Sequence, residues 1–322
     1  MNCLCCGKPL SGGTPASAAD STWHTSCIRS FFHTSALPQI DLTDSAFETL
    51  AEQSVHDGIT VPGVQKKISL HLSREKKARL TIRNHPAGYI LKPQTERYPR
   101  LPEAEHLVMQ LADAAGIPTV PHALLQNASG AYMYITRRVD RDFSSQLYAM
   151  EDFCQLEGRP TRDKYRSSYE RCARVIERFS SRPGLDLAEL YFRLVFCFVT
   201  GNSDMHLKNF SLIETKPCNR DFILSPAYDL LPVNLLLPED KDETALTLHG
   251  KKRNLTANDF LSFASACSLQ EKTARHLMQK IVSLQGTFLD LCDASYLPPD
   301  LSGALKELIT GRMKVLASKS EV

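Results

Sequence analysis

Polar side chains suited to phosphoryl-transfer chemistry directly follow an apolar stretch of this chain. The segment GNSDMHLKNF at residues 201–210 comes after LYFRLVFCFVT at residues 190–200. Asp204 and Asn209 are spaced as D-x-x-x-x-N, so that the aspartate could accept the proton of a hydroxyl and the amide oxygen could bind Mg²⁺. Asp204 could instead only cap a helix. The number of polar side chains in this segment favours the chemical role, because burying polar groups that have no function would cost free energy.

Two further side chains fit the same chemistry. Asp229, in SPAYDLL, stands twenty residues after Asn209, at the far end of an expected hairpin. Its carboxylate could complete a magnesium site beside the asparagine, because Mg²⁺ takes oxygen ligands together with substrate phosphates. Lys208 adds a positive charge near the phosphoryl group that is transferred.

A nucleotide site is expected in the first half of the chain. Lys92 ends the apolar strand YIL, from which its ammonium could reach the α- and β-phosphates, and Glu105 could orient it by an ion pair. Upstream, VPGVQKK places Gly63 in a turn beside Gln65 and Lys67, so that backbone N–H groups could cover the phosphates. Taken singly, Lys92 could be a solvated lysine and Glu105 an ordinary first-turn acid. Their order along the chain favours the functional interpretation.

The first 27 residues have the spacing of a metal site. Cys3 and Cys6 form one pair, and after seventeen residues His24 and Cys27 form another. Three thiolates and one imidazole can surround Zn²⁺ as a tetrahedron, which predicts a structural zinc site, with Cys5 as the spare thiol. The alternative is a cysteine-rich N-terminus without metal.

Composition narrows the class of protein. The 322 residues include 38 Lys and Arg and 36 Asp and Glu, for a net charge of +2. The basic residues are spread along the chain, so direct nucleic-acid binding is not expected. No apolar run approaches the ~20 residues of a membrane helix, and MNCLCCGKPL lacks a signal pattern, so we expect a cytoplasmic protein without membrane contact. Six scattered cysteines are interpreted as reduced thiols: Cys154, Cys172, Cys197, Cys218, Cys267 and Cys292.

Hydrophobic patterning predicts an α+β protein with a zinc-knuckle-like segment (1–30), a strand-rich lobe (31–145) and a mostly helical lobe (146–322). In the first lobe we expect a helical connection over 28–55, then strands within 58–73 and 78–94. A helix should follow over 102–118, with Pro102 at its start and Gly116 at its end, and then a hairpin over 122–139. The second lobe should be helical except for a hairpin over 208–229. A strand-rich and a helical lobe suit a nucleotide cleft.

Several motifs together resemble a known family. GVQKKISL, YILKP, EAEHLVMQLADAAGIPTVP, RRVDR, EDFCQ, GNSDMHLKNFSLI, SPAYDLLP and LHGKKRNLT are similar to the HipA family of bacterial serine/threonine-protein kinases, toxins of type II toxin–antitoxin systems. The resemblance runs from about residue 58 to the C-terminal helices. It implies a two-lobed fold of the protein-kinase type, with ATP and Mg²⁺ as cofactors.

The resemblance also implies the roles of individual residues. Asp204 would be the proton acceptor, assisted by Lys208, and Asn209 and Asp229 the magnesium ligands. Thr60 matches the autophosphorylated position, where a serine is usual. The ATP contacts that it implies are Pro62, Gly63, Val64, Gln65, Lys66 and Lys67 in the phosphate loop, Lys92 with Glu105, the adenine-facing Arg137, Arg138 and Val139, and His206, Asn209, Tyr228 and Asp229.

Substrate and partners also follow from the resemblance. Family targets are aminoacyl-tRNA synthetases, and a HipB-like DNA-binding antitoxin is an implied partner. The chain is similar to the shortened HipT kinases, whose N-terminal subdomain is a separate small protein, so a HipS-like partner is also implied. Two alternatives remain: a small-molecule phosphotransferase of the aminoglycoside or choline kinase type, which shares D-x-x-x-x-N, and a catalytically silent interaction protein.

Overall fold

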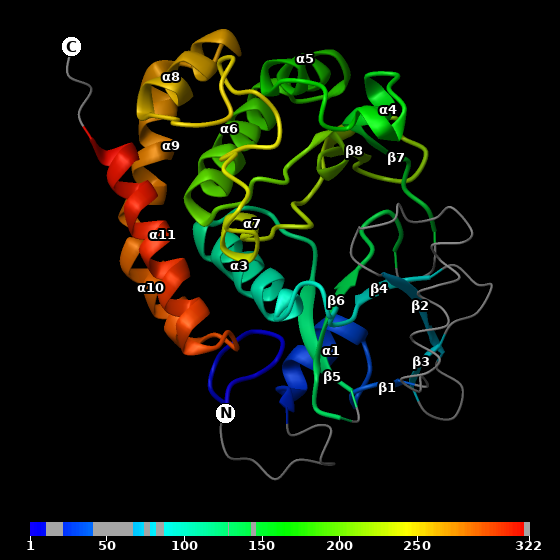
Figure 1. Ribbon diagram of the computed structural model, residues 1–322. Helices are drawn as coiled ribbons and strands as arrows, with labels where there is room; N and C mark the ends of the chain where they lie inside the picture. The colour runs from blue at the N-terminus through cyan, green and yellow to red at the C-terminus, as the bar shows by residue number, and fades with distance from the viewer. Residues whose placement is uncertain are drawn as a thin grey trace. The chain divides into compact units, whose positions relative to one another are not determined.

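The computed structural model (Figure 1) describes residues 1–10, 22–40, 67–73, 78–81, 87–127, 129–142 and 146–318. Thr60 and residues 62–66, the expected autophosphorylation site and most of the expected phosphate loop, lie outside these ranges. The chain forms two compact units. Unit 1 comprises Met1–His106 and Val120–Ser145, and unit 2 comprises Leu107–Thr119 and Gln146–Val322.

Unit 1 is built on a sheet that has six strands within the described ranges, in the order β1-β3-β2-β4-β6-β5. Neighbouring strands are antiparallel except for the parallel pair β1 and β3. The expected hairpin is present as β5 and β6, and the chain turns between them with Gly130 at φ 82°. The strands are β1 (Gln39–Ile40), β2 (Ile68–Ser73), β3 (Arg79–Thr81), β4 (Tyr89–Lys92), β5 (His122–Gln126) and β6 (Tyr132–Arg137).

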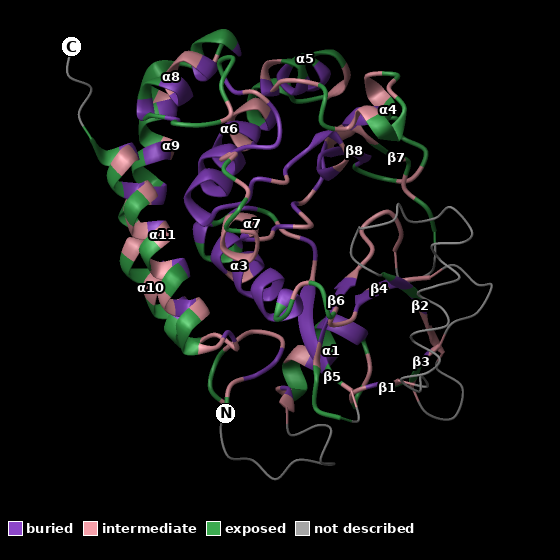
Figure 2. Cartoon of the chain, viewed as in Figure 1, coloured by how far each residue is buried: buried purple, intermediate pink, exposed green. Residues whose placement is uncertain are grey.

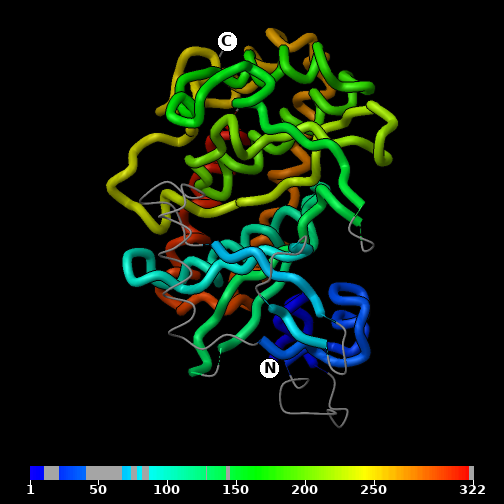
Figure 3. Tube along the Cα trace, turned by 90° about the vertical axis from the view of Figure 1, so that its right-hand side faces the viewer, coloured from blue at the N-terminus to red at the C-terminus, as the bar shows by residue number. Residues whose placement is uncertain are grey.

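Within unit 1, residues of two helices contact this sheet. Side chains of β4 alternate between its faces, so Tyr89 and Lys92 point in opposite directions. Tyr89 packs against Phe31 and Phe32 of α1 (Thr25–Phe32), and Lys92 pairs with Glu105 of α3 (Leu101–Ala115). Figures 1 and 3 both show α1 beside the strands. The helical connection expected over 28–55 is therefore wrong in part, because α1 ends at Phe32 and residues 39–40 form a strand; residues 41–55 lie outside the described ranges.

The helix α3 begins and ends close to the residues that the sequence predicts. Pro102 lies in its first turn, where a missing N–H costs nothing, and the helix ends before Gly116, which has φ 80°. Its side chains are buried on nearly all sides, as Figure 2 shows in purple. These buried positions include the polar Glu103, Glu105 and His106, so the helix lies inside the protein although it is not apolar all round.

Unit 2 is organised around α6 (Pro183–Thr200). Every residue from Leu190 to Thr200 in this helix is buried, and α5, α9 and α11 pack around it (Figures 1 and 2). The other α-helices that the structure describes here are α4 (Phe153–Leu156), α5 (Tyr169–Phe179), α7 (Val233–Leu236), α8 (Ala257–Ala266), α9 (Glu271–Ser283), α10 (Gln285–Ala294) and α11 (Pro299–Ala317). None of the described helices is both long and apolar enough to cross a membrane.

A small sheet lies next to the first half of α6, where the Leu224 N–H of the sheet donates to the Asp186 carboxylate at 2.8 Å. The hairpin expected over 208–229 is present as β8 (Ser211–Glu214) and β9 (Phe222–Leu224). The short strand β7 (Met150–Asp152) adds to β8 and was not expected, because its three residues have no strand pattern of their own. Arg193 of α6, which is 2% exposed, donates to the Ser225 carbonyl at 2.8 Å and ties the helix to this hairpin.

Candidate active site

The segment that follows α6 folds around the backbone carbonyl of Asp204. Helix α6 ends at Thr200, and the C-cap Gly201, which has φ 75°, lets the chain turn away. The Asp204 carbonyl then accepts from the His206 N–H at 2.8 Å and from the Asn209 side-chain amide at 2.9 Å. Residues Leu207–Asn209 form one 3₁₀ turn (η3). These bonds hold Asp204 and Asn209 of the D-x-x-x-x-N motif together.

The carboxylate of Asp204 accepts a hydrogen bond from a hydroxyl group. The Tyr165 hydroxyl donates to its Oδ1 at 2.6 Å. Burial raises the pKa of Asp204, the bond from Tyr165 lowers it, and repulsion from Asp229 raises it, for a net shift upward from the ordinary aspartate value. An aspartate in this state is a stronger base than a solvated one and already receives an O–H donor, the geometry needed for taking a proton from a hydroxyl.

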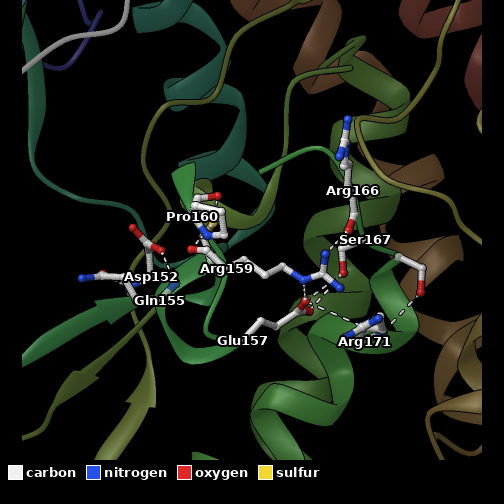
Figure 4. Close-up of polar contacts among 10 residues, drawn as sticks. Asp152, Gln155, Glu157, Arg159, Pro160, Arg166, Ser167 and Arg171 are labelled. Carbon is white, nitrogen blue, oxygen red and sulfur yellow. Dashed lines mark hydrogen bonds and ion pairs between the residues drawn. The ribbon is translucent and has the colours of Figure 1, made fainter. Parts of the chain in front are cut away.

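The segment that carries Tyr165 is fixed by a polar network around Glu157 (Figure 4). The buried Glu157 carboxylate pairs with Arg159, accepts from the Ser167 hydroxyl at 3.0 Å and lies 3.6 Å from Arg171. Arg159 also donates to the Arg166 carbonyl at 2.8 Å. The network therefore links residues that precede Tyr165 to residues that follow it. These links, together with its own hydrogen bond, fix the position of Tyr165 at Asp204.

Asn209 and Asp229 have the donor atoms that a magnesium site requires. Because the Asn209 amide nitrogen donates to Asp204, its oxygen is the atom that can meet a cation. Burial and the negative charges of Asp204, Asp229 and Asp240 all raise the pKa of Tyr165. The three carboxylates therefore lie close enough to the same hydroxyl to affect it. A divalent cation would relieve this concentration of negative charge, and amide and carboxylate oxygens are its usual protein ligands. The residues present therefore fit Mg²⁺.

Three other expected site residues lie around the same segment. Burial and the nearby Lys164 lower the pKa of His206 to about 4, so its ring is neutral at physiological pH. Lys208 pairs with Asp152, the N-cap of α4, at 2.6 Å. Tyr228 donates to the Lys208 carbonyl at 3.2 Å. The charge of Lys208 is thus partly neutralised within the protein, and its expected role at the phosphoryl group stays a prediction.

In unit 1 the structure brings Lys92 and Glu105 together. The lysine ammonium lies 2.7 Å from the glutamate oxygen, and the two side chains are 10% and 0% exposed. The same ammonium lies 5.5 Å from the ring centre of Tyr134, the cross-strand neighbour of Lys92 on β6. A buried lysine held by a carboxylate and an aromatic ring has a fixed position, as a phosphate-binding lysine needs.

The other expected nucleotide contacts in the described part of unit 1 are Arg137, Arg138, Val139 and Lys67. Arg138 pairs with Asp140 at 2.6 Å, and its N–H donates to the Gly88 carbonyl at 2.9 Å. The Arg137 N–H donates to the Pro121 carbonyl at 2.9 Å, and Val139 is half-buried. Lys67 is exposed just before β2, and the preceding loop residues are outside the described ranges.

Sequence reasoning missed several residues that shape the site. Tyr165 was one, and Asn234 is another: its N–H donates to the Gly201 carbonyl at 2.9 Å, and its side chain donates to the Asp240 carbonyl at 3.2 Å and accepts from Arg312 at 2.7 Å. Asp240 in turn accepts from the Ser203 hydroxyl at 2.8 Å. No local pattern identifies these residues, because each meets the motif from a distant part of the chain.

Comparison with known proteins gives consistent matches. Residues 59–286 match the family described as HipA-like C-terminal domain. A Sinorhizobium fredii protein named "Putative kinase Y4mE" is 32% identical over 209 residues, 62% of this chain and 48% of that protein. A Haemophilus influenzae protein named "Putative kinase" is 30% identical over 225 residues, 66% of this chain and 63% of that protein. The matched part therefore spans less than two thirds of either relative.

A solved structure is also similar. It is that of the toxin–antitoxin complex of HipA, HipB and operator DNA from Shewanella oneidensis MR-1, with a TM-score of 0.66 and 17% identity. The likeness covers 85% of this chain and 73% of that one. It shows that the two share a fold.

Proposed function

Because the chain belongs to the HipA-like C-terminal domain family, we propose that it is an ATP- and Mg²⁺-dependent protein kinase that phosphorylates serine or threonine. The observation that carries this proposal is the short hydrogen bond between the Tyr165 hydroxyl and the Asp204 carboxylate, 2.6 Å long. It supports a base that is placed to receive a hydroxyl, with the Asn209 amide fixed beside it. A substrate serine or threonine hydroxyl would be received by the other oxygen of the same carboxylate, Oδ2.

The reaction needs a hydroxyl nucleophile, a base and a bound nucleotide. In our proposal Asp204 orients the substrate hydroxyl and accepts its proton as the phosphoryl group is transferred. Asn209 and Asp229 would hold Mg²⁺, which supplies charge neutralisation to the ATP phosphates. Lys92, oriented by Glu105, would bind the α- and β-phosphates, as the 2.7 Å ion pair supports. The expected phosphate loop would cover them.

For substrate and partners we extend the proposal to a toxin. The substrate would be an aminoacyl-tRNA synthetase, whose phosphorylation would stop translation. The similar HipA structure was solved with HipB and operator DNA. By analogy, this chain would be neutralised by a HipB-like antitoxin or by a small HipS-like protein, with any DNA contact made through the partner.

We also propose that the kinase regulates itself at Thr60. A phosphate there would bring a charge of about −1.5 to −2 close to Lys66 and Lys67 in the sequence and would draw the loop away from ATP. Mass spectrometry after incubation with ATP and Mg²⁺ should find phosphate on Thr60. Thr60→Asp should weaken ATP binding and Thr60→Ala should preserve it; equal binding by both variants would contradict this regulation.

The decisive experiment compares Asp204→Asn with Asp290→Asn. Both changes remove one carboxylate charge, but Asp290 is exposed on α10, outside the site. Purified protein would be incubated with γ-labelled ATP, Mg²⁺ and a panel of aminoacyl-tRNA synthetases. We expect wild type and Asp290→Asn to label a synthetase and Asp204→Asn to be slower by ~10²–10⁴-fold.

Growth provides a second readout. Expression of wild type should arrest a bacterial host, and Asp204→Asn should not. Full activity of Asp204→Asn would contradict the mechanism. Transfer only to aminoglycosides or choline would instead identify a small-molecule phosphotransferase, and binding without any transfer would identify a silent interaction protein.

A further inference from the structure

Four potential metal ligands from the N-terminal segment converge in unit 1. The ligand atoms of Cys3, Cys6, His24 and Cys27 all lie within 4.8 Å of one another. His24 Nδ1 is 3.4 Å from the Cys6 sulfur and 3.8 Å from the Cys27 sulfur. In a tetrahedral zinc site with ordinary bond lengths, a nitrogen and a sulfur ligand are separated by about 3.6 Å. The separations thus already match those around a bound zinc ion.

The imidazole of His24 is oriented as a ligand. Its Nε2 lies 3.0 Å from the Pro9 carbonyl oxygen. A carbonyl only accepts, so Nε2 must carry the proton, and the lone pair of Nδ1 then faces the sulfurs. Metal-binding histidines are usually fixed in this way, by a hydrogen bond from the ring nitrogen that does not touch the metal.

The backbone around Cys3 has the shape of a metal-binding turn. The Gly7 N–H donates to the Cys3 carbonyl at 2.9 Å, with Gly7 at φ 69°, and the Cys3 N–H donates to the Lys8 carbonyl at 2.8 Å. The His24 N–H also donates to the Cys3 sulfur at 3.3 Å. Such a contact stabilises a negatively charged thiolate, and it joins the two halves of the cluster through their own backbone.

The segment that carries these ligands attaches to the sheet of unit 1 at two strands. Trp23, next to His24, lies 5.5 Å from the rings of both Phe31 and Phe32, and these pack against Tyr89 of β4. At the sheet edge, the Leu124 N–H of β5 donates to the Leu4 carbonyl at 2.8 Å.

The helix in this segment is short. Helix α1 has 8 residues, and its N-cap His24 makes no side-chain capping bond. A helix of this length is not stable alone, so its position depends on what holds its ends.

We propose that Cys3, Cys6, His24 and Cys27 bind one structural Zn²⁺ ion that fixes the N-terminal segment against the sheet. Four protein ligands fill a tetrahedral site and leave no position for substrate, so the ion is structural and not catalytic. We leave Cys5 out of the ligand set, because the ligand atoms that all lie within 4.8 Å of one another are those of Cys3, Cys6, His24 and Cys27. The proposal is independent of the kinase assignment, since it concerns folding of the segment and not phosphoryl transfer.

Metal content tests the ligand set. Full-length protein produced with adequate zinc should contain one zinc per chain by elemental analysis. Cys27→Ser and His24→Ala should lose most of it, whereas the matched controls Cys5→Ser and Cys218→Ser should keep it. With Co²⁺ in place of zinc, wild type and Cys5→Ser should show the absorption of a tetrahedral thiolate site. Metal-free wild type, a disulfide within the cluster, iron as the native metal, or equal loss in Cys5→Ser would each overturn the proposal.

Fluorescence tests the structural role without a mutation. Trp23 is the single tryptophan of the chain and is 2% exposed, so its emission reports on this segment alone. A zinc-selective chelator should shift the emission to longer wavelength as Trp23 becomes solvated, and Zn²⁺ but not Mg²⁺ should reverse the shift. Unchanged emission after the zinc has been removed would contradict the structural role.

Discussion

At the scale of single residues, Tyr165 is the side chain with the clearest influence on Asp204. The two are 39 positions apart in sequence, and their hydrogen bond favours the charged carboxylate. Asp204 and Asn209 were predictable because their spacing is local and has a known chemical meaning. Tyr165 was not, because an ordinary tyrosine in a polar loop gives no signal until the fold brings it to the motif.

We predict that Tyr165→Phe moves the pH dependence of the proposed phosphoryl transfer. The hydrogen bond from Tyr165 lowers the pKa of Asp204, so its removal should raise that pKa further above the ordinary value. The base must be deprotonated to act, so the acid limb of kcat/KM should shift to higher pH, with little change in the alkaline plateau. The measurement is a pH–rate profile of phosphoryl transfer.

Tyr169→Phe is the matched control for this shift. Tyr169 donates to the Met205 carbonyl at 3.0 Å, so the control also removes a hydroxyl that contacts the catalytic segment, but one that does not bond the carboxylate. It should lower stability and leave the acid limb in place. An acid limb that stays unchanged in Tyr165→Phe, or moves equally in both variants, would show that the tyrosine does not tune the base.

At the scale of elements, the helices and strands that could be predicted are those whose own residues mark where they begin and end. Pro102 and Gly116 marked both ends of α3, and the apolar run before Gly201 marked α6. Strands β1 and β7 were missed because they have only two and three residues and exist through pairing with β3 and β8. Short strands of this kind are set by their partners and not by local propensity.

We predict that Gly201→Ala destabilises unit 2 more than Gly250→Ala. Both glycines have positive φ, 75° and 77°, so alanine is strained at either position. A Cβ at Gly201 would also lie 2.6 Å from Leu308 Cδ2, whereas a Cβ at Gly250 meets nothing within 4 Å. Gly250→Ala should cost about 1–2 kcal/mol for the backbone alone. Gly201→Ala should cost about 1–3 kcal/mol more for the added contact.

Urea unfolding followed by circular dichroism measures this difference. Gly184→Ala, in open space near the start of α6, serves as a third variant with neither strain nor contact, and it should be neutral or slightly stabilising. Equal losses at Gly201 and Gly250 would mean that α11, which carries Leu308, can move aside without cost.

We predict that the pair of Lys92 on β4 and Glu105 on α3 separates stability from activity. Replacing one partner, as in Lys92→Met or Glu105→Leu, leaves a buried charge alone and should cost about 3–5 kcal/mol. The double variant, with both charges gone, should recover most of the stability because apolar side chains tolerate the buried site. It should nevertheless stay inactive, since it lacks the ammonium that we propose binds the ATP phosphates.

Thermal unfolding and ATP binding of the four proteins complete this cycle. Arg275→Met is a matched control, because it breaks an exposed ion pair with Glu271 on α9 and neither residue is an expected nucleotide contact. It should cost less than about 1 kcal/mol. A double variant that binds ATP as tightly as wild type would exclude Lys92 from the nucleotide site.

At the scale of the whole molecule, the segment 201–210, which carries the proposed catalytic residues, depends on the last helix of the described chain. Arg312 of α11 donates to the Phe198 carbonyl at the end of α6, 114 positions earlier, and to the Asn234 side chain at 2.7 Å. Asn234 in turn holds the Gly201 carbonyl through its N–H. A sequence read from start to end cannot reveal this dependence, because it arises only when the C-terminal helix packs against α6.

We predict that Arg312→Met lowers both the stability of the protein and its proposed kinase activity. Methionine keeps much of the apolar packing on Phe198, whose ring lies 4.9 Å from the guanidinium, but leaves a helix-end carbonyl and the Asn234 oxygen without their charged donor. Hydrogen bonds from charged groups contribute about 1.5–3 kcal/mol each, so the loss of these two bonds should lower the free energy of unfolding by about 3–6 kcal/mol. Because Asn234 connects to Gly201, kcat should fall at temperatures where the variant is still folded.

Lys314→Met, an exposed change on the same helix, is the control and should leave both the stability and kcat unaltered. A stable, fully active Arg312→Met would mean that the packing of α11 alone, without this donor, holds the catalytic segment in place.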